Sequence, residues 1–226
     1  MIKIFKINMV LLLLVCNQLP SYAQSENDMT NHSLILPLKT GKNPSVQWET
    51  LVIAPVNLFM QTQPITDTSP HIQLELNVVE DTNSYTTFLW YYGAANGGAK
   101  TNYPKAYQNY AFDLKIDTAE VALVVKKLTF EKALFLELGQ TAVIGNLTLR
   151  FEDCISEWST DSNGDQTDAF ATYTISVSEA QEQQTLSFTS LETQGGNELA
   201  LPWKSYKILV KETTEKAIKL MVFKNK

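Results

Sequence analysis

The stretch YAFDLKIDTAEVALVVKK, residues 110–127, decides the fold of this 226-residue chain. Apolar side chains fill every second position before its short acidic turn, as in Phe112, Leu114 and Ile116, and apolar residues return after the turn. This period is that of a strand with one buried face, and two such runs across a turn predict an antiparallel hairpin. A second version, YKILVKETTEKAIKLMVFK, occupies residues 206–224. We interpret the two stretches as one hairpin that is used twice.

The resemblance extends upstream of both hairpins. Thr50-Leu-Val-Ile53 and Thr141-Ala-Val-Ile144 open two similar series of elements, and an alternating strand in each series ends at Glu80 or at Glu179. The shift between the series is about 90 to 100 residues, a domain-sized period. Because order and spacing agree along the whole segment, we predict an internal duplication with its boundary near residues 132–138.

The rest of the pattern predicts an all-β protein. Further alternating runs begin near Val46, Ile72 and Leu147, turn residues separate the runs, and no segment combines a helical period with helix caps. We expect two tandem immunoglobulin-like antiparallel β-sandwich domains, residues 45–132 and 133–226. One larger β-sandwich built from both halves is the alternative.

Residues 1–23 have the pattern of a signal peptide. The uncharged apolar run Met9–Cys16 follows Lys3 and Lys6 and precedes Ser21-Tyr-Ala23. The sequence therefore predicts an exported protein of a bacterial envelope, periplasmic, cell-surface or secreted, with no membrane span after cleavage.

Lipid attachment at Cys16 is the alternative for this segment, and bulky Val15 argues against it because a small residue normally precedes a lipidated cysteine. Residues 24–44 have the composition of a flexible lead-in with one short strand near Leu34–Leu36. Removal of residues 1–23, which hold two lysines and no acid, changes the formal charge from −6 to −8. This acidic balance does not favour nucleic acid as a partner.

Cleavage would leave Cys154 as the one cysteine, so no disulfide is expected within the chain. Cys154 follows an alternating apolar segment, and two acids, Glu152 and Asp153, directly precede it. Neighbouring acids raise a thiol pKa, which disfavours the reactive thiolate. We expect an inert thiol that packs as a small apolar side chain.

An aromatic cluster around a glycine-rich turn is the first candidate binding site. In a strand, Phe88, Trp90 and Tyr92 point one way and Leu89 and Tyr91 point the other, so one of the two sets belongs to a core. The exposed set would stack on a sugar or anchor a partner. The candidate ligand-binding residues are Trp90, Tyr91, Tyr92, Tyr103 and Tyr107. Ordinary strand packing is the competing interpretation.

The loop DSNGDQTD, residues 161–168, places oxygen-bearing side chains at alternate positions, as a calcium loop does. The candidate ligands are Asp161, Asn163, Asp165 and Asp168. Over these eight residues the loop resembles the aspartate-rich loops of thrombospondin type 3 and dockerin repeats. It departs from the EF-type pattern at Gln166, where glycine is required, and at Thr172, where a bidentate acid is required. A hairpin tip on Asn163-Gly164 is the alternative.

Catalytic signatures are sparse. The two histidines, His32 and His71, are not in metal-ligand spacing, and no Gly-x-Ser-x-Gly elbow occurs. We therefore expect a non-enzymatic protein-interaction or scaffold module of the envelope, without a cofactor, calcium excepted. A glycan- or ligand-binding sandwich that uses the aromatic residues is the alternative, and a hydrolase would have to recruit one of the two histidines.

Overall fold

The computed structural model describes residues 33–61, 72–91, 104–117 and 120–225. The predicted signal peptide, Cys16 and both histidines lie outside these residues. Residues 32–226 form one compact unit. Within the described ranges, no helix is long and apolar enough to cross a bilayer.

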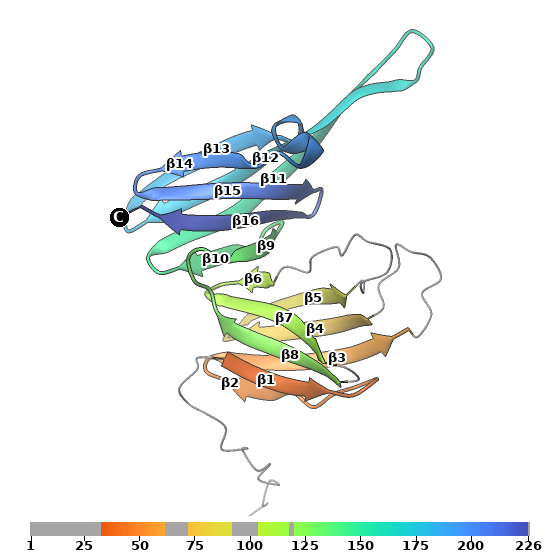
Figure 1. The fold of residues 1–226 in the computed structure, drawn as a ribbon, viewed down its shortest axis with the longest axis vertical. Helices are drawn as coiled ribbons and strands as arrows, with labels where there is room; N and C mark the ends of the chain where they lie inside the picture. Colours follow the sequence, from red (N-terminus) through yellow and green to blue (C-terminus); the bar gives the residue numbers. More distant parts are fainter. Residues whose placement is uncertain (1–32, 62–71, 92–103, 118–119, 226) are drawn as a thin grey trace, which may run out of the picture. The chain divides into compact units, whose positions relative to one another are not determined.

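The described chain consists of β-strands and one short 3₁₀ helix, which confirms the all-β prediction (Figure 1). The strands of the first half are β1 (Ser33–Leu38), β2 (Val46–Trp48), β3 (Leu51–Met60), β4 (Ile72–Glu80), β5 (Asn83–Tyr91), β6 (Lys105–Tyr107), β7 (Tyr110–Asp117) and β8 (Glu120–Lys127). The second half contains β9 (Ala133–Glu137), β10 (Thr141–Ile144), β11 (Leu147–Thr160), β12 (Gln166–Glu179), β13 (Glu182–Thr189), helix η2 (Ser190–Gly196), β14 (Leu199–Trp203), β15 (Tyr206–Thr214) and β16 (Ala217–Lys224).

The strands form three sheets whose order repeats between the halves. The first half contributes β2-β3-β4-β5 as one sheet, and the second half contributes β10-β11-β12-β13 as another. The third sheet runs β1-β8-β7-β6-β9-β16-β15-β14, so it consists of two matching four-strand parts. These parts meet at β6 and β9, which pair in parallel through Lys105 and Phe135. Both predicted hairpins, β7–β8 and β15–β16, occupy the same position within their halves.

Each half has its own hydrophobic core between two sheets. In the first half, Leu74 and Leu76 of β4 belong to the same buried cluster as Phe112 of β7. In the second half, Phe151 of β11 shares a cluster with Ile208 of β15. The period-two pattern that predicts these strands places alternate residues between the two layers, as in a β-sandwich.

Local irregularities also recur at matching positions. A β-bulge follows Pro55, the fifth residue of β3, and another follows Phe151, the fifth residue of β11. The turns between β4 and β5 and between β12 and β13 each place a non-glycine residue in the left-handed region, Asp81 with φ of 53° and Ala180 with φ of 54°. Bulges and strained turns are properties of individual positions, so their recurrence supports duplication more strongly than a shared alternation does.

One detail of the predicted repeat is wrong. Thr50–Ile53 spans the turn into β3, whereas Thr141–Ile144 is β10, whose counterpart in the repeated order is β2. The two segments have similar apolar patterns, but their neighbours in the sheet differ. The short strand predicted near Leu34–Leu36 is confirmed: it is β1, which pairs with β8 along its whole length, and Leu36 packs on the first core.

Candidate functional site

The outer face of sheet β2-β3-β4-β5 carries an exposed aromatic pair on its edge strand, β5. Leu89 points inward and is buried, so alternation directs Phe88 and Trp90 to the outer face. Their side chains are 37% and 38% exposed. The two ring planes lie 10° from parallel, and their centroids are 6.3 Å apart. The structure therefore selects one of the two aromatic faces that alternation allowed.

The other predicted aromatic residues do not join this pair. Tyr107 is buried and stacks on Tyr85 with the ring centroids 4.8 Å apart, so it belongs to the core instead of a ligand-binding surface. Tyr91 is half-buried against the same core. Tyr92 and Tyr103 lie outside the described residues.

Polar residues lie next to the aromatic pair in the sheet. Gln73 of β4 is opposite Trp90, and Glu75 is opposite Phe88. The next strand, β3, places Phe59 opposite Gln73 and Asn57 opposite Glu75. Phe59 is half exposed. On the outer face, the amide of Gln73 and the carboxylate of Glu75 therefore lie between aromatic residues of β3 and β5.

Beneath Trp90, at the junction of the halves, is a charged network that the sequence analysis does not predict. Lys105 of β6 is buried and forms an ion pair with Glu137 of β9. The Lys105 ammonium also donates to Thr87 Oγ1 at 2.9 Å and lies 4.5 Å from the centroid of the Trp90 ring. The Glu137 carboxylate accepts further hydrogen bonds from Tyr85 Oη at 2.5 Å and from Thr87 Oγ1 at 3.0 Å.

Burial controls the proton affinities in this network. Desolvation lowers the pKa of Lys105, and the attraction of Glu137 opposes that effect. Desolvation, followed by the negative charge of Glu137, raises the pKa of Tyr85 well above its usual value. The tyrosine therefore stays protonated as a donor to Glu137. The network joins β5 and β6 of the first half to β9 of the second.

The sequence offers one weak signal for this network. Lys105 and Glu137 are charged residues within short segments that are otherwise apolar or aromatic, Lys-Ala-Tyr107 and Ala133-Leu-Phe-Leu-Glu. A charge at the end of a strand usually faces solvent, so this pattern alone does not indicate a buried pair.

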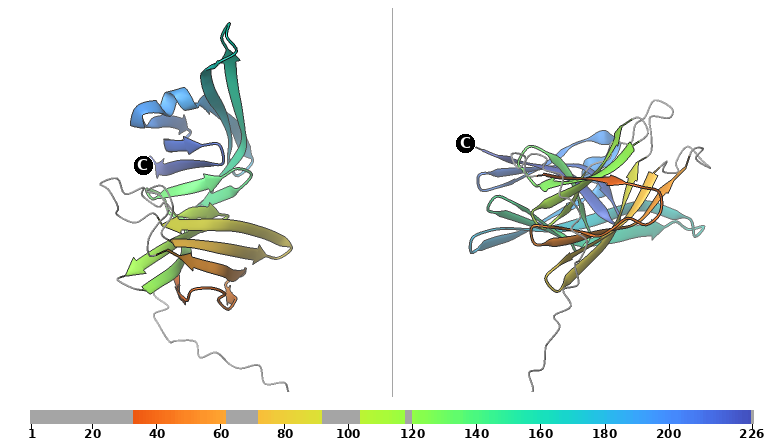
Figure 2. Two further views of the ribbon diagram at one scale, coloured as in Figure 1. Left: turned by 90° about the vertical axis from the view of Figure 1, so that its right-hand side faces the viewer. Right: turned by 90° about the horizontal axis from the view of Figure 1, so that it is seen from below.

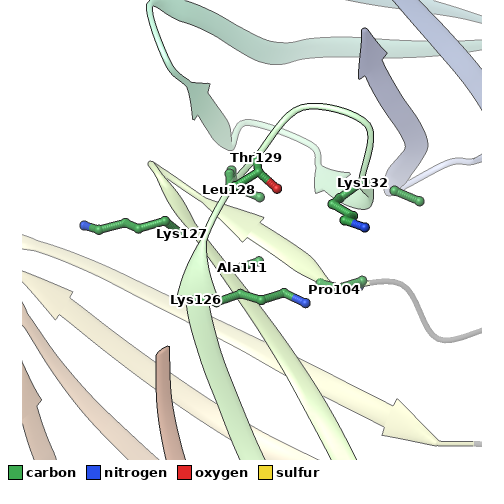
Figure 3. Close-up of a pocket in the computed structure, with 8 residues that line it drawn as sticks. Pro104, Ala111, Lys126, Lys127, Leu128, Thr129 and Lys132 are labelled. Carbon is green, nitrogen blue, oxygen red and sulfur yellow. The ribbon is translucent and has the colours of Figure 1, made fainter. Parts of the chain in front are cut away.

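A hollow of about 210 Å³ lies near the same junction (Figure 3). It is lined by Pro104, Ala111, Lys126, Lys127, Leu128, Thr129, Lys132 and Ala133. Lys126 and Lys132 reach toward the same side in Figure 3, whereas Lys127 extends the other way and pairs with Glu49. The junction therefore carries a small concentration of positive charge.

The predicted calcium loop forms the tip of the β11–β12 hairpin. Its first acid, Asp161, accepts hydrogen bonds through Oδ1 from the backbone NH groups of Asn163 and Asp165, both at 2.9 Å. The Gly164 NH also donates to the Asp161 carbonyl oxygen at 3.1 Å, so Ser162 and Asn163 are the central residues of the turn and Gly164 follows with φ of 86°. The predicted hairpin tip is present, but it is not a two-residue turn on Asn163-Gly164. Among the described residues, no three His, Cys, Asp or Glu side chains converge as a metal site. The side chain of Asp168 lies outside the described atoms.

Cys154 is half-buried in β11 and forms no disulfide. Desolvation raises the pKa of its thiol, and Glu215 and Asp153 raise it further. A raised pKa reduces the thiolate population, as the sequence analysis expects.

The β11–β12 hairpin extends beyond the sheet to which it belongs (Figures 1 and 2). Strand β10 pairs with β11 only as far as Arg150, and β13 pairs with β12 only from Thr172 onward. Phe151 exchanges backbone hydrogen bonds with Gly139 and Gln140, and the Ala171 NH donates to Ser190 Oγ. Residues 152–170, which we call the arm, lie beyond these contacts. No other strand of the described chain flanks the arm.

The arm exposes large apolar side chains. Trp158 is 62% exposed and Ile155 is 52% exposed. The sequence between Phe151 and Ala171 contains six acidic residues and no basic one. The arm is therefore acidic, it has an exposed tryptophan, and none of the described strands pairs with either of its edges.

No protein-family model matches this chain, and no curated protein is similar to it in sequence.

Proposed function

We propose that this protein is an exported, non-enzymatic interaction module of a bacterial envelope and that the arm is its contact element. The observation that carries the proposal is the arm itself, a two-stranded extension with Trp158 exposed near its tip. Exposed tryptophan is typical of the residues that dominate binding energy in protein interfaces.

The outer part of the arm has no counterpart among the described strands of the first half. In the first half, β3 ends at Met60 and β4 begins at Ile72. Their counterparts continue further, β11 to Thr160 and β12 back to Gln166. A two-stranded hairpin without flanking strands is marginally stable in water, and an open strand edge is a template for pairing with another chain. A partner strand could add to one edge of the arm through backbone hydrogen bonds.

Charge indicates what kind of partner fits. Six acids without a basic residue would make two arms repel each other, so pairing between copies of the arm is unfavourable. A positively charged extended segment of another protein fits both the open strand edge and the negative charge of the arm, because it supplies backbone hydrogen bonds and opposite charge. Electrostatic attraction would also speed the encounter and make binding salt-dependent.

The tandem arrangement is part of the proposal. We propose two duplicated sandwich units, residues 33–127 and 133–224, that share one long sheet. Two separate cores and the repeated strand order support this division. Their immunoglobulin-like character is not confirmed. In each half one sheet consists of four consecutive strands, and the other combines three consecutive strands with the half's first strand, β1 or β9. An immunoglobulin domain instead has the strand orders ABED and CFG.

Site-specific photo-crosslinking tests the contact. A benzophenone amino acid replaces Trp158 in the full chain, in cells that produce the protein, and the matched control carries the probe at Ile35, an equally exposed apolar position on β1. We expect discrete adducts at position 158 and none at position 35. In envelope fractions the adducts should weaken at about 0.5 M salt, and Glu157→Lys should reduce them. No adduct at position 158, or the same adducts at both positions, would overturn the proposal.

A further inference from the structure

We infer that the outer face of sheet β2-β3-β4-β5 binds a neutral carbohydrate chain. In this site Phe88 and Trp90 form the stacking surface, and Gln73 and Glu75 supply the hydrogen-bonding groups. The surface belongs to the first half of the chain, whereas the arm belongs to the second. The inference therefore does not depend on the interaction proposed for the arm.

The aromatic pair has the chemistry that a sugar requires. One face of a pyranose ring presents C–H groups, and its rim presents hydroxyl groups. Phe88 and Trp90 offer nearly parallel rings 6.3 Å apart, each more than a third exposed. Large aromatic surfaces that remain partly exposed lose little conformational entropy on binding.

Polar groups lie where the hydroxyl rim would be. Gln73 and Glu75 are directly across from Trp90 and Phe88 in the register of β4 and β5. Cross-strand neighbours on one face have Cβ atoms about 5 Å apart. Neither side chain forms a hydrogen bond with another residue in the described part of the chain. Phe59 continues the row beyond Gln73, so the polar groups lie between aromatic residues.

The Trp90 ring is fixed by a cation on one of its faces, so a sugar would stack on the other face. The Lys105 ammonium lies 4.5 Å from the centre of the Trp90 ring, and Glu137 and Thr87 hold that ammonium in place. A fixed ring loses less entropy when a ligand stacks on it.

The second half provides an internal comparison. In register, Ser187 of β13 lies opposite Thr174 of β12, as Phe88 lies opposite Glu75 in the first half. Thr189 likewise takes the position of Trp90. The same strand order thus forms with small hydroxyl side chains at these positions. The fold does not require the exposed rings, which favours a binding role for them.

Charge selects the class of carbohydrate. Glu75 is the one charged residue in the two rows formed by Asn57, Glu75 and Phe88 and by Phe59, Gln73 and Trp90. The nearby Lys105 ammonium is neutralised by its ion pair with Glu137. A single carboxylate repels uronic acid and sulfate groups, while it accepts hydrogen bonds from neutral hydroxyls.

Affinity electrophoresis of the purified protein tests the inference. The probes are three soluble neutral polysaccharides, a β-glucan, a glucomannan and a xylan, together with acidic polygalacturonate. We expect at least one neutral probe to retard the protein and polygalacturonate to leave its mobility unchanged. Retardation by none of the neutral probes, or stronger retardation by polygalacturonate, would overturn the inference.

Two sets of variants locate the site. The double substitution Phe88→Ser with Trp90→Thr introduces the residues of the second half and should weaken binding at least about tenfold. Trp158→Ala, which removes an exposed aromatic ring from the arm, should leave binding unchanged. The double substitution Gln73→Ala with Glu75→Ala removes no ring and should weaken binding about fivefold. This second variant tests the same site if the first variant fails to fold. Unchanged affinity in a folded variant of either set would place the ligand elsewhere and refute the inference.

Discussion

Replacing Glu137 with alanine should destabilise the protein by about 4 kcal/mol. The substitution leaves the buried Lys105 ammonium without its carboxylate and removes the acceptor for Tyr85 Oη and Thr87 Oγ1. Removal of one member of a buried ion pair typically costs about 3–5 kcal/mol.

The magnitude follows from the contacts. Each of the three hydrogen bonds to the charged Glu137 carboxylate contributes about 1.5–3 kcal/mol. Without any compensation by water, their loss would cost about 4.5–9 kcal/mol. The Glu137 side chain is 23% exposed and that of Lys105 is 8% exposed, so water can reach the carboxylate and replace part of this loss. We therefore expect a value near the middle of the range for buried pairs.

Urea denaturation at neutral pH, followed by circular dichroism, measures the effect. A double-mutant cycle with Lys105→Met isolates the pair, because the combined variant contains no unpaired buried charge. The free energy of unfolding of the double variant Lys105→Met with Glu137→Leu should lie within about 1–2 kcal/mol of that of the natural protein. A small loss remains because Tyr85 and Thr87 still lack their acceptor. The coupling energy should exceed about 2 kcal/mol.

The control is Glu198→Ala, which removes the carboxylate that pairs with Lys211 at a more exposed site. Its cost should stay below about 1 kcal/mol. A loss under about 1 kcal/mol for Glu137→Ala, or a coupling energy near zero, would refute a network that holds the two halves together.

Three further predictions concern other parts of the molecule. Burial, followed by the hydrogen bond to Glu179, raises the pKa of Tyr206 to about 12, so the folded state holds this proton more tightly than the unfolded chain. The stability that this difference contributes is present below pH 10 and is lost between about pH 10 and 12. A pKa difference of about two units corresponds to at most about 2.7 kcal/mol. Solvent screening at partly exposed Glu179 lowers this contribution to about half. Urea midpoints across this range should fall less steeply for Tyr206→Phe than for the natural protein, and equal slopes would contradict the assignment. Phe151→Ala, which empties a fully buried site, should cost about 3–5 kcal/mol in the same assay, whereas Phe59→Ala, on the outer face, should cost less than about 1 kcal/mol. Because Asp161 already accepts two backbone hydrogen bonds, calcium at about 2 mM should shift the melting temperature by less than about 1 °C, and a larger rise would show that the loop binds it.

Sequence alone determined the all-β class and the positions of two similar hairpins. Period-two alternation at Phe112, Leu114 and Ile116 depends on local backbone geometry, and the turn chemistry at Asn163-Gly164 is likewise local. The pairing of β7 with β8 and of β15 with β16 follows from short connections, so these hairpins can be predicted without knowledge of the rest of the chain.

Tertiary structure decided which residues form the candidate sites. Alternation required Phe88 and Leu89 to face opposite ways, but only packing against the first core shows that Leu89 is the buried one. Lys105 and Glu137 meet because β6 and β9 are adjacent in the long sheet. Trp158 is exposed because none of the described strands flanks the arm. Each of these outcomes depends on contacts between segments far apart in sequence, and local periodicity does not specify such contacts.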